Sequence, residues 1–180
     1  DQMTFFKKMS PSHESLPLPT SIEKDILGII NAIQRNMGIN KFLFQGAPGT
    51  GKTESVRQIA RILERNLFCV DFDTIIDSKL GQTQKNIAAL FDELNHFAHP
   101  EKILILFDEI DAIALDRTNS QDLREMGRAT SAILKGFDNL NEQITIIATT
   151  NLFKHFDKSL SRRFDSIVDF NRYAQEDLQV

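Results

Sequence analysis

Two hydrophobic patterns alternate along the chain and predict its secondary structure. The first is a short run of consecutive apolar residues, which is typical of a strand buried on both faces of a sheet. Such runs occupy residues 42–44, 67–70, 103–107, 144–148 and 167–168. The second is a longer segment with apolar residues three or four positions apart, which is typical of an amphipathic helix.

The clearest helical segment begins at the capping box Thr20-Ser21-Ile22-Glu23. Apolar residues then recur at helical spacing as far as Met37, and Gly38 supplies a stop signal. Three further helical patterns cover residues 56–63, 87–94 and 123–137. Strands that alternate with helices predict an α/β fold, in which helices cover both faces of a parallel sheet. Ligands in this architecture bind at the carboxyl ends of the strands.

The two ends of the chain differ from this pattern. Residues 1–19 carry two phenylalanines and then a stretch that ends Leu16-Pro17-Leu18-Pro19, and its prolines favour extended chain over helix. We interpret this segment as a leader or linker. The chain begins with Asp1, and its last five residues resemble the opening of a helix, so we expect a fragment of a longer protein.

Composition narrows the function classes. A length of 180 residues with 41% hydrophobic and 26% charged residues is typical of one globular domain, and the longest apolar run, 103–107, is too short to cross a bilayer. The net charge of −4 argues against a protein that wraps nucleic acid. No signal-peptide pattern opens the sequence, and a single cysteine, Cys69, cannot form an internal disulfide, so we expect a cytoplasmic setting. Cys69 lies in the apolar run 67–70, where we expect a buried, inert thiol.

A phosphate-binding pattern follows the first apolar run directly. Residues 46–53 match G-x-x-x-x-G-K-[ST], and the helix of residues 56–63 begins where the match ends. Glycines let several backbone N–H groups converge on phosphate oxygens, and the helix N-terminus adds its positive end. Lys52 then supplies a positive charge for the β- and γ-phosphates, and the Thr53 hydroxyl is a hard ligand for Mg²⁺. The residues assigned to nucleotide binding are Gly46, Ala47, Pro48, Gly49, Thr50, Gly51, Lys52, Thr53 and Glu54.

The alternative interpretation of residues 46–53 is an ordinary glycine-rich turn between a strand and a helix. The full pattern arises by chance in roughly one sequence of this length in a hundred or fewer. The strand before it and the helix after it favour nucleotide binding over that alternative.

Two adjacent carboxylates, Asp108 and Glu109, follow the apolar run 103–107. Beside a phosphate loop they divide two tasks: Asp108 holds Mg²⁺, and Glu109 orients and deprotonates the water that attacks the γ-phosphate. The alternatives are a helix N-cap for Asp108 and a solvent-facing charge for Glu109. The phosphate loop favours the catalytic interpretation.

Two later segments offer further candidates. Asn151 follows the run 144–148, and its amide can donate to a phosphate oxygen or orient water, although by itself it is more typical of a turn. Arg162 and Arg163 precede the last predicted strand. Taken alone, these arginines do not favour a catalytic role over a surface pair or a cap on a helix end.

Four motifs in order, GAPGTGKT, ILILFDEID, IIATTN and LSRRFD, resemble those of the AAA family of ATPases within the AAA+ group. The resemblance covers residues 20–173. It implies a P-loop NTPase subdomain with a five-stranded parallel sheet, ATP or ADP and Mg²⁺ as ligands, and assembly into a ring that is usually a hexamer. By the same resemblance, Lys52 and Thr53 match the Walker A pair, Asp108 and Glu109 the Walker B pair, and Asn151 the sensor-1 residue.

The resemblance also assigns roles at and beyond the subunit boundary. Arg162 and Arg163 match the arginine fingers, which in the family reach the ATP of the neighbouring subunit. The family's helical lid begins near Tyr173, so residues 174–180 would be its start, and without the lid we expect this chain to be a monomer. Residues 77–81 resemble the family's pore loop, with Lys79 where an aromatic residue usually grips a polypeptide.

These observations predict an ATPase that couples Mg-ATP hydrolysis to remodelling of a macromolecular partner, most simply a protein. One alternative is an ATPase that acts on nucleic acid, which the net charge disfavours. Another is an ATP-binding assembly module with negligible turnover, which Glu109, Asn151 and the arginines disfavour. A small-molecule kinase lacks a visible acceptor pocket, and a GTPase would need an N/T-K-x-D motif that the sequence does not contain.

Overall fold

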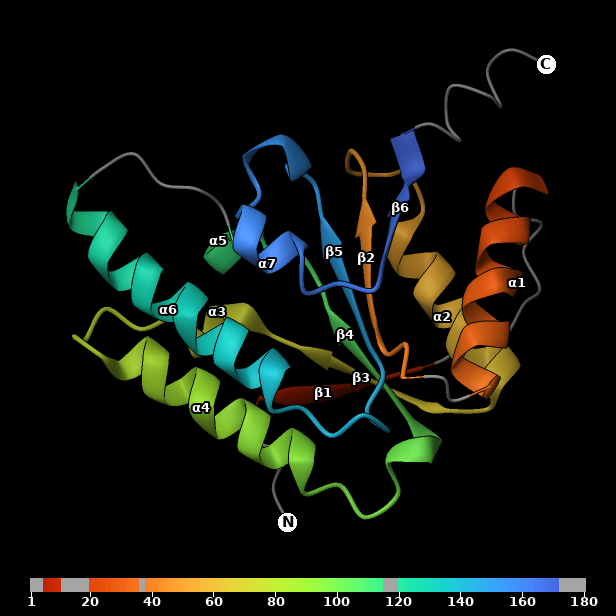
Figure 1. The fold of residues 1–180 in the computed structure, drawn as a ribbon, viewed down its shortest axis with the longest axis horizontal. Helices are drawn as coiled ribbons and strands as arrows, with labels where there is room; N and C mark the ends of the chain where they lie inside the picture. Colours follow the sequence, from red (N-terminus) through yellow and green to blue (C-terminus); the bar gives the residue numbers. More distant parts are fainter. Residues whose placement is uncertain (1–4, 11–19, 36–37, 115–119, 172–180) are drawn as a thin grey trace.

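A computed structural model describes residues 5–10, 20–35, 38–114 and 120–171. Its centre is a six-stranded sheet in the order β1-β3-β4-β5-β2-β6 (Figure 1). The strands are β1 (Phe6–Met9), β2 (Lys41–Gln45), β3 (Asn66–Val70), β4 (Ile103–Phe107), β5 (Ile146–Thr150) and β6 (Ser166–Asp169). Strands β2 to β6 pair in parallel, which confirms the five predicted strands.

The sixth strand corrects the sequence interpretation. Strand β1 lies within the segment assigned to a leader or linker, and it pairs antiparallel with β3, so that Phe6 lies opposite Val70. Phe6 is buried and its ring meets that of Phe97 edge to face at 6.0 Å. Because β1 is a four-residue edge strand with two exposed lysines in its middle, it carries no continuous apolar run for the pattern to reveal.

Four long helices confirm the amphipathic pattern: α1 (Thr20–Arg35), α2 (Lys52–Leu63), α4 (Gln82–Asn95) and α6 (Ser120–Asp138). Three single-turn helices were not predicted: α3 (Phe72–Ile75), α5 (Asp111–Ala114) and α7 (Lys158–Ser161). Short 3₁₀ turns occupy Pro100–Lys102 and Phe153–His155. Among the described helices, none is long and apolar enough to cross a membrane.

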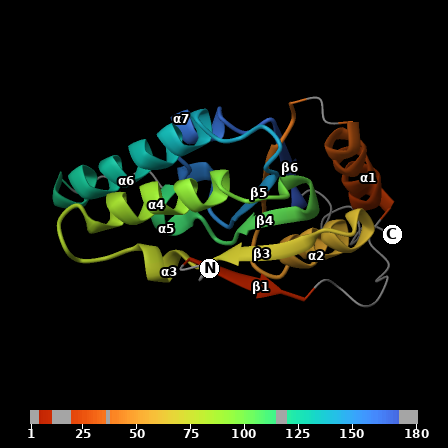
Figure 2. The same cartoon turned by 90° about the horizontal axis from the view of Figure 1, so that it is seen from below.

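The helices form a layer on each face of the sheet (Figures 1 and 2). Strand β4 is buried at all five positions, and its side chains alternate between two cores. Leu104 and Leu106 join the core under α1 and α2. Ile105 and Phe107 join the core under α4 and α6. Burial on both faces explains why the parallel strands have continuous apolar runs.

Parallel pairing brings the carboxyl ends of the central strands to one edge of the sheet. The loop after β2 begins at Gly46, whose N–H donates to the carbonyl of Thr150 at the end of β5 over 3.1 Å. The N–H of Ile110, just after β4, donates to the carbonyl of Thr149 over 3.0 Å. Three segments far apart in sequence therefore meet beside the N-terminus of α2.

Candidate active site

The loop between β2 and α2 depends on glycine at defined positions. A Cβ on Gly46 would lie 2.9 Å from the Cβ of Phe170 and 3.0 Å from Oγ1 of Thr50, so no larger residue fits without a shift. Gly49 and Gly51 have φ angles of 82° and 93°, a region that other residues rarely adopt. These requirements hold the loop beside the sheet edge, with residues 47–49 exposed.

The N-terminus of α2 is open to a ligand. Gly51 occupies the N-cap position, and no side chain caps the helix there. The first turn of a helix leaves N–H groups without intrahelical partners, and the helix dipole adds positive potential at this end. An anion such as a phosphate is suited to that position.

Lys52 is buried at the start of α2, with 7% of its surface exposed. Its Nζ donates to the carbonyls of Gly46, over 2.5 Å, and Ala47, over 3.0 Å. Burial lowers the pKa of Lys52 from its usual 10.5, and the nearby carboxylates of Asp108, Asp111 and Glu109 oppose that shift. The loop thus holds a cation that a phosphate group would stabilise.

The acidic pair lies beside this loop. Thr53 Oγ1 donates to Asp108 Oδ1 over 3.1 Å, so the first turn of α2 and the end of β4 are in direct contact. A hydroxyl and a carboxylate are the hard oxygen donors that Mg²⁺ prefers, usually in company with substrate phosphates. Among the described residues, no group of three or more His, Cys, Asp or Glu side chains could hold a metal ion. The hydroxyl of Thr53 and the carboxylate of Asp108 fit Mg²⁺ bound together with substrate phosphates.

Glu109 is exposed and has a φ of 51°, which is unusual for a residue other than glycine. Together with Asp108 it lines a cavity of about 420 Å³, whose lining also includes Lys7 of β1 and Asp71 after β3. The Glu109 carboxylate is accessible to water there, as a general base must be.

The backbone of Asn151 is tied by Asp111 to the turn that follows the acidic pair. Asp111 accepts a hydrogen bond from the Thr150 hydroxyl through Oδ1, and one from the Asn151 N–H, over 2.9 Å, through Oδ2. The end of β5 is thereby tied to the turn after β4. Five predicted residues, Lys52, Thr53, Asp108, Glu109 and Asn151, thus share one edge of the sheet.

The two arginines differ from each other in their surroundings. Both are exposed at the end of α7. Arg163 Nε donates to Asp138 Oδ1 over 2.9 Å, whereas the side chain of Arg162 has no partner among the described residues. Among the described residues, neither arginine side chain hydrogen-bonds to Lys52, Thr53, Asp108, Glu109 or Asn151.

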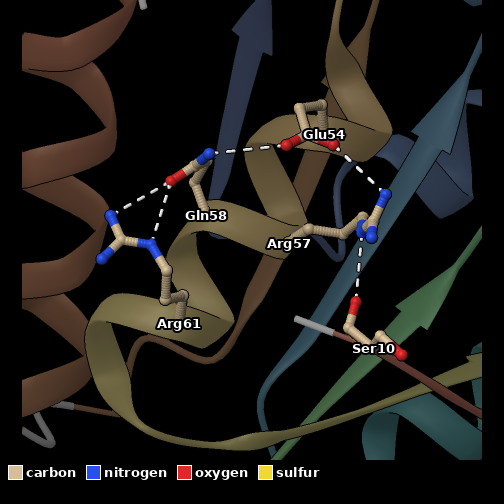
Figure 3. A network of polar contacts seen from close by, with 5 residues as sticks. All are labelled: Ser10, Glu54, Arg57, Gln58 and Arg61. Carbon is tan, nitrogen blue, oxygen red and sulfur yellow. Dashed lines mark hydrogen bonds and ion pairs between the residues drawn. The ribbon is translucent and has the colours of Figure 1, made fainter. Parts of the chain in front are cut away.

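Glu54 takes part in a network of partly buried polar contacts along α2. Figure 3 shows its carboxylate between Arg57, at 3.4 Å, and the amide of Gln58, also at 3.4 Å. Arg57 Nε also donates to the carbonyl of Ser10, just after β1, over 3.1 Å, and the oxygen of Gln58 accepts from Arg61. The assignment of Glu54 to nucleotide binding stays a prediction.

Sequence reasoning missed three residues of the site. Thr149 and Asp111 lie inside the quoted motifs, but their hydrogen bonds join residues about 40 positions apart. The third is Asn171, whose side-chain oxygen accepts from the Ala47 N–H over 2.8 Å. Partner choice over such separations depends on strand order, which the hydrophobic pattern alone does not specify.

Comparison with known proteins identifies the family. Residues 42–172 match the family described as "ATPase family associated with various cellular activities (AAA)". The chain belongs to the AAA family. An uncharacterized AAA family ATPase of Sinorhizobium fredii is 33% identical over an alignment of 178 residues that covers 93% of this chain and 53% of that protein. The resemblance of the sequence motifs to this family is therefore confirmed.

Two further comparisons extend the match. A putative 26S proteasome regulatory subunit homolog of Methanothermobacter thermautotrophicus is 30% identical over 138 residues, covering 76% of this chain and 36% of that protein. A solved structure titled as the HORMA:CdnC:Trip13 complex of E. coli MS115-1 has a TM-score of 0.66 at 23% identity, covering 83% of this chain and 61% of that chain. This AAA chain spans about half or less of the length of the two relatives and shares the fold of the solved structure.

Proposed function

We propose that this AAA domain binds Mg-ATP in the loop 46–53 and hydrolyses it to ADP and phosphate. The observation that carries the proposal is the contact between Thr53 and Asp108, with Glu109 exposed beside them. This arrangement supplies hard oxygen ligands and a carboxylate base next to an uncapped helix N-terminus. An ordinary glycine-rich turn requires none of these features.

The residues divide the chemistry as follows. The ammonium of Lys52 and the backbone N–H groups at the start of α2 bind the phosphates. Thr53 and Asp108 would hold Mg²⁺, which supplies charge neutralisation to the phosphoryl oxygens. Glu109 accepts the proton of the attacking water, and the amide of Asn151 orients that water or the γ-phosphate.

Replacement of Glu109 by Gln tests the proposal. The amide keeps the shape of the side chain but removes the base, so Glu109→Gln should bind ATP with the parent affinity and lose at least about 100-fold in steady-state phosphate release. Asp108→Asn should in addition raise the Mg²⁺ concentration needed. Phosphate release by Glu109→Gln at the parent rate would exclude Glu109 as the base.

Coupling to a protein partner completes the proposed function. The net charge of −4 favours a protein over nucleic acid, and one relative carries the name of a proteasome regulatory subunit homolog. The single cysteine supports a reducing, cytoplasmic setting. Stimulation of the ATPase by DNA, but by no protein, would overturn the choice of partner.

The proposed contact with the protein partner is the loop between α3 and α4. Lys79 and Leu80 are both exposed there, Leu80 to 77%, and the Lys79 N–H donates to Asp77 Oδ1 over 2.8 Å. Lysine side chains attract acidic segments, and the neighbouring leucine adds apolar contact. Partner-stimulated ATPase activity should therefore fall at high salt, because exposed charges are screened over about 8 Å already at physiological ionic strength.

Assembly of several copies is the last part of the proposal. Family resemblance assigns Arg162 and Arg163 to the nucleotide of a neighbouring subunit in a ring, usually a hexamer. Their exposure at the end of α7 supports that role, since an arginine finger must reach beyond its own subunit. We expect the 180-residue chain by itself to be a monomer.

A further inference from the structure

Thr149, next to last in β5, contacts both members of the acidic pair. Its hydroxyl donates to Asp108 Oδ1 over 2.9 Å and accepts from the backbone N–H of Glu109 over 2.8 Å. The residue is 1% exposed, so water does not substitute for either bond. A threonine hydroxyl can donate one hydrogen bond, and here Asp108 accepts it.

These two bonds constrain the orientation of the Asp108 carboxylate and the backbone of Glu109. Asp108 Oδ1 accepts two hydroxyl donors, Thr149 from β5 and Thr53 from α2, whereas Oδ2 has no partner among the described residues. The carboxylate is thereby turned so that one oxygen remains available. The other bond fixes the backbone N–H of Glu109. The φ of this residue is 51°, a conformation that is unfavourable for residues other than glycine.

We propose that Thr149 is a positioning residue, which orients the Asp108 carboxylate toward a divalent cation and fixes the backbone of the base Glu109. This inference rests on the proposed function, because it concerns how the same site holds Mg²⁺ and activates water. Thr149 acts through its neighbours and need not touch the nucleotide. A hydrogen bond to a charged group contributes about ten- to a hundredfold in an equilibrium or a rate.

The test compares four chains: the parent, Thr149→Val, Thr149→Ser and Thr145→Val. Valine keeps the shape of threonine and removes both hydrogen bonds, and serine restores the hydroxyl. Thr145, 4% exposed and just before β5, accepts from Arg65 over 3.3 Å at the opposite end of the strand. Its replacement controls for the loss of a buried hydroxyl far from the acidic pair.

Two readouts are needed. The first is the affinity of the ADP-loaded chain for Mn²⁺, measured by electron paramagnetic resonance, which does not require turnover. We expect Thr149→Val to weaken it about tenfold, with Thr149→Ser and Thr145→Val within twofold of the parent. The second is ATP hydrolysis, in which Thr149→Val should lower kcat at least about tenfold with little change in KM. If Thr149→Val melts below the assay temperature, Thr149→Ala replaces it.

The outcomes separate this inference from the proposed function. Equal Mn²⁺ affinity in Thr149→Val and Thr145→Val would overturn the positioning role, whatever happens to kcat. Absence of hydrolysis by the parent and by Thr149→Ser would overturn the proposed turnover, and the Mn²⁺ titration would still decide the role of Thr149. Weaker Mn²⁺ binding only in the variants without a hydroxyl at position 149 supports it.

Discussion

The charge state of Lys52 should report directly on phosphate binding. Burial lowers the pKa of Lys52 in the free protein, so the ammonium loses its proton at a lower pH than that of an exposed lysine. A bound phosphate favours the ammonium and raises that pKa, so ATP binding should take up protons in alkaline buffers below the usual pKa of 10.5. Calorimetry in two buffers with different ionisation enthalpies measures the uptake. Lys52→Arg stays protonated, and the same uptake in that variant would assign the proton to another group.

Cys69 should be unreactive in the folded chain. Burial raises the pKa of its thiol to about 11, with the Asp108 carboxylate as the next cause. The thiolate is the reactive form, and a rise of about two pKa units from 9.0 reduces its population near pH 8 about a hundredfold. Alkylation by iodoacetamide should therefore be about a hundred times slower in native buffer than in urea. Comparable rates would contradict the pKa shift.

The structure corrects the expectation that the Cys69 thiol is fully buried. Cys69 is half-buried and lines the cavity beside Asp108.

At the residue scale, the sequence motifs predicted the groups that we propose to bind phosphate and Mg²⁺, but not the groups that position them. Lys52, Thr53 and Asp108 follow from the motif spacing, because the chemistry restricts which residue types serve there. Thr149 and Asp111 act by hydrogen bonds to partners in other segments. Their residue types alone are compatible with an ordinary strand end or turn.

Packing between α4 and α6 depends on a glycine in the middle of a helix. A Cβ on Gly136 would lie 2.3 Å from the ring of Phe91, whereas one on Gly127 of the same helix would meet nothing within 4 Å. Gly136→Ala should therefore destabilise the chain by about 1–3 kcal/mol through overpacking. Gly127→Ala should stabilise it by about 0.5–1 kcal/mol, since alanine favours helix over glycine. Urea unfolding of both variants measures the difference, and equal stability would contradict the close contact.

At the element scale, burial decided what the sequence could predict. The five parallel strands and four long helices were predicted because each buries a continuous or periodic apolar pattern in one or both of the two cores. Strand β1 was missed because it lies at the edge with Lys7 and Lys8 exposed. The short helices α3, α5 and α7 contain four residues each, too few for a helical period to be recognised.

For the whole molecule, the shared-site hypothesis distinguishes the two arginines. Arg163 is paired with Asp138, while Arg162 has no side-chain partner in the described part of the chain. We expect the 180-residue chain to be a monomer. Its ATP hydrolysis should be very slow because no neighbouring subunit then supplies an arginine finger, which contributes about 10³- to 10⁵-fold in rate. In a longer chain that assembles, specific activity should rise with protein concentration.

Mixing variants of that longer chain tests the same hypothesis. Arg162→Ala should flatten the rise more than Arg163→Ala does. An equimolar mixture of Arg162→Ala and Glu109→Gln should recover activity that neither has alone, because some interfaces then combine an intact base with an intact finger. Full activity in dilute monomer, measured alongside sedimentation velocity, would contradict a shared site.

The central claim is that the loop 46–53 is a nucleotide phosphate site, and calorimetric titration of ATP with Mg²⁺ tests it most directly. The parent and Lys85→Ala, which removes an exposed lysine of α4, should bind ATP with equal affinity. Lys52→Ala should show no measurable binding, since the phosphates lose the ammonium that the loop holds. Binding of ATP by Lys52→Ala as tightly as by the parent would contradict the assignment of this loop.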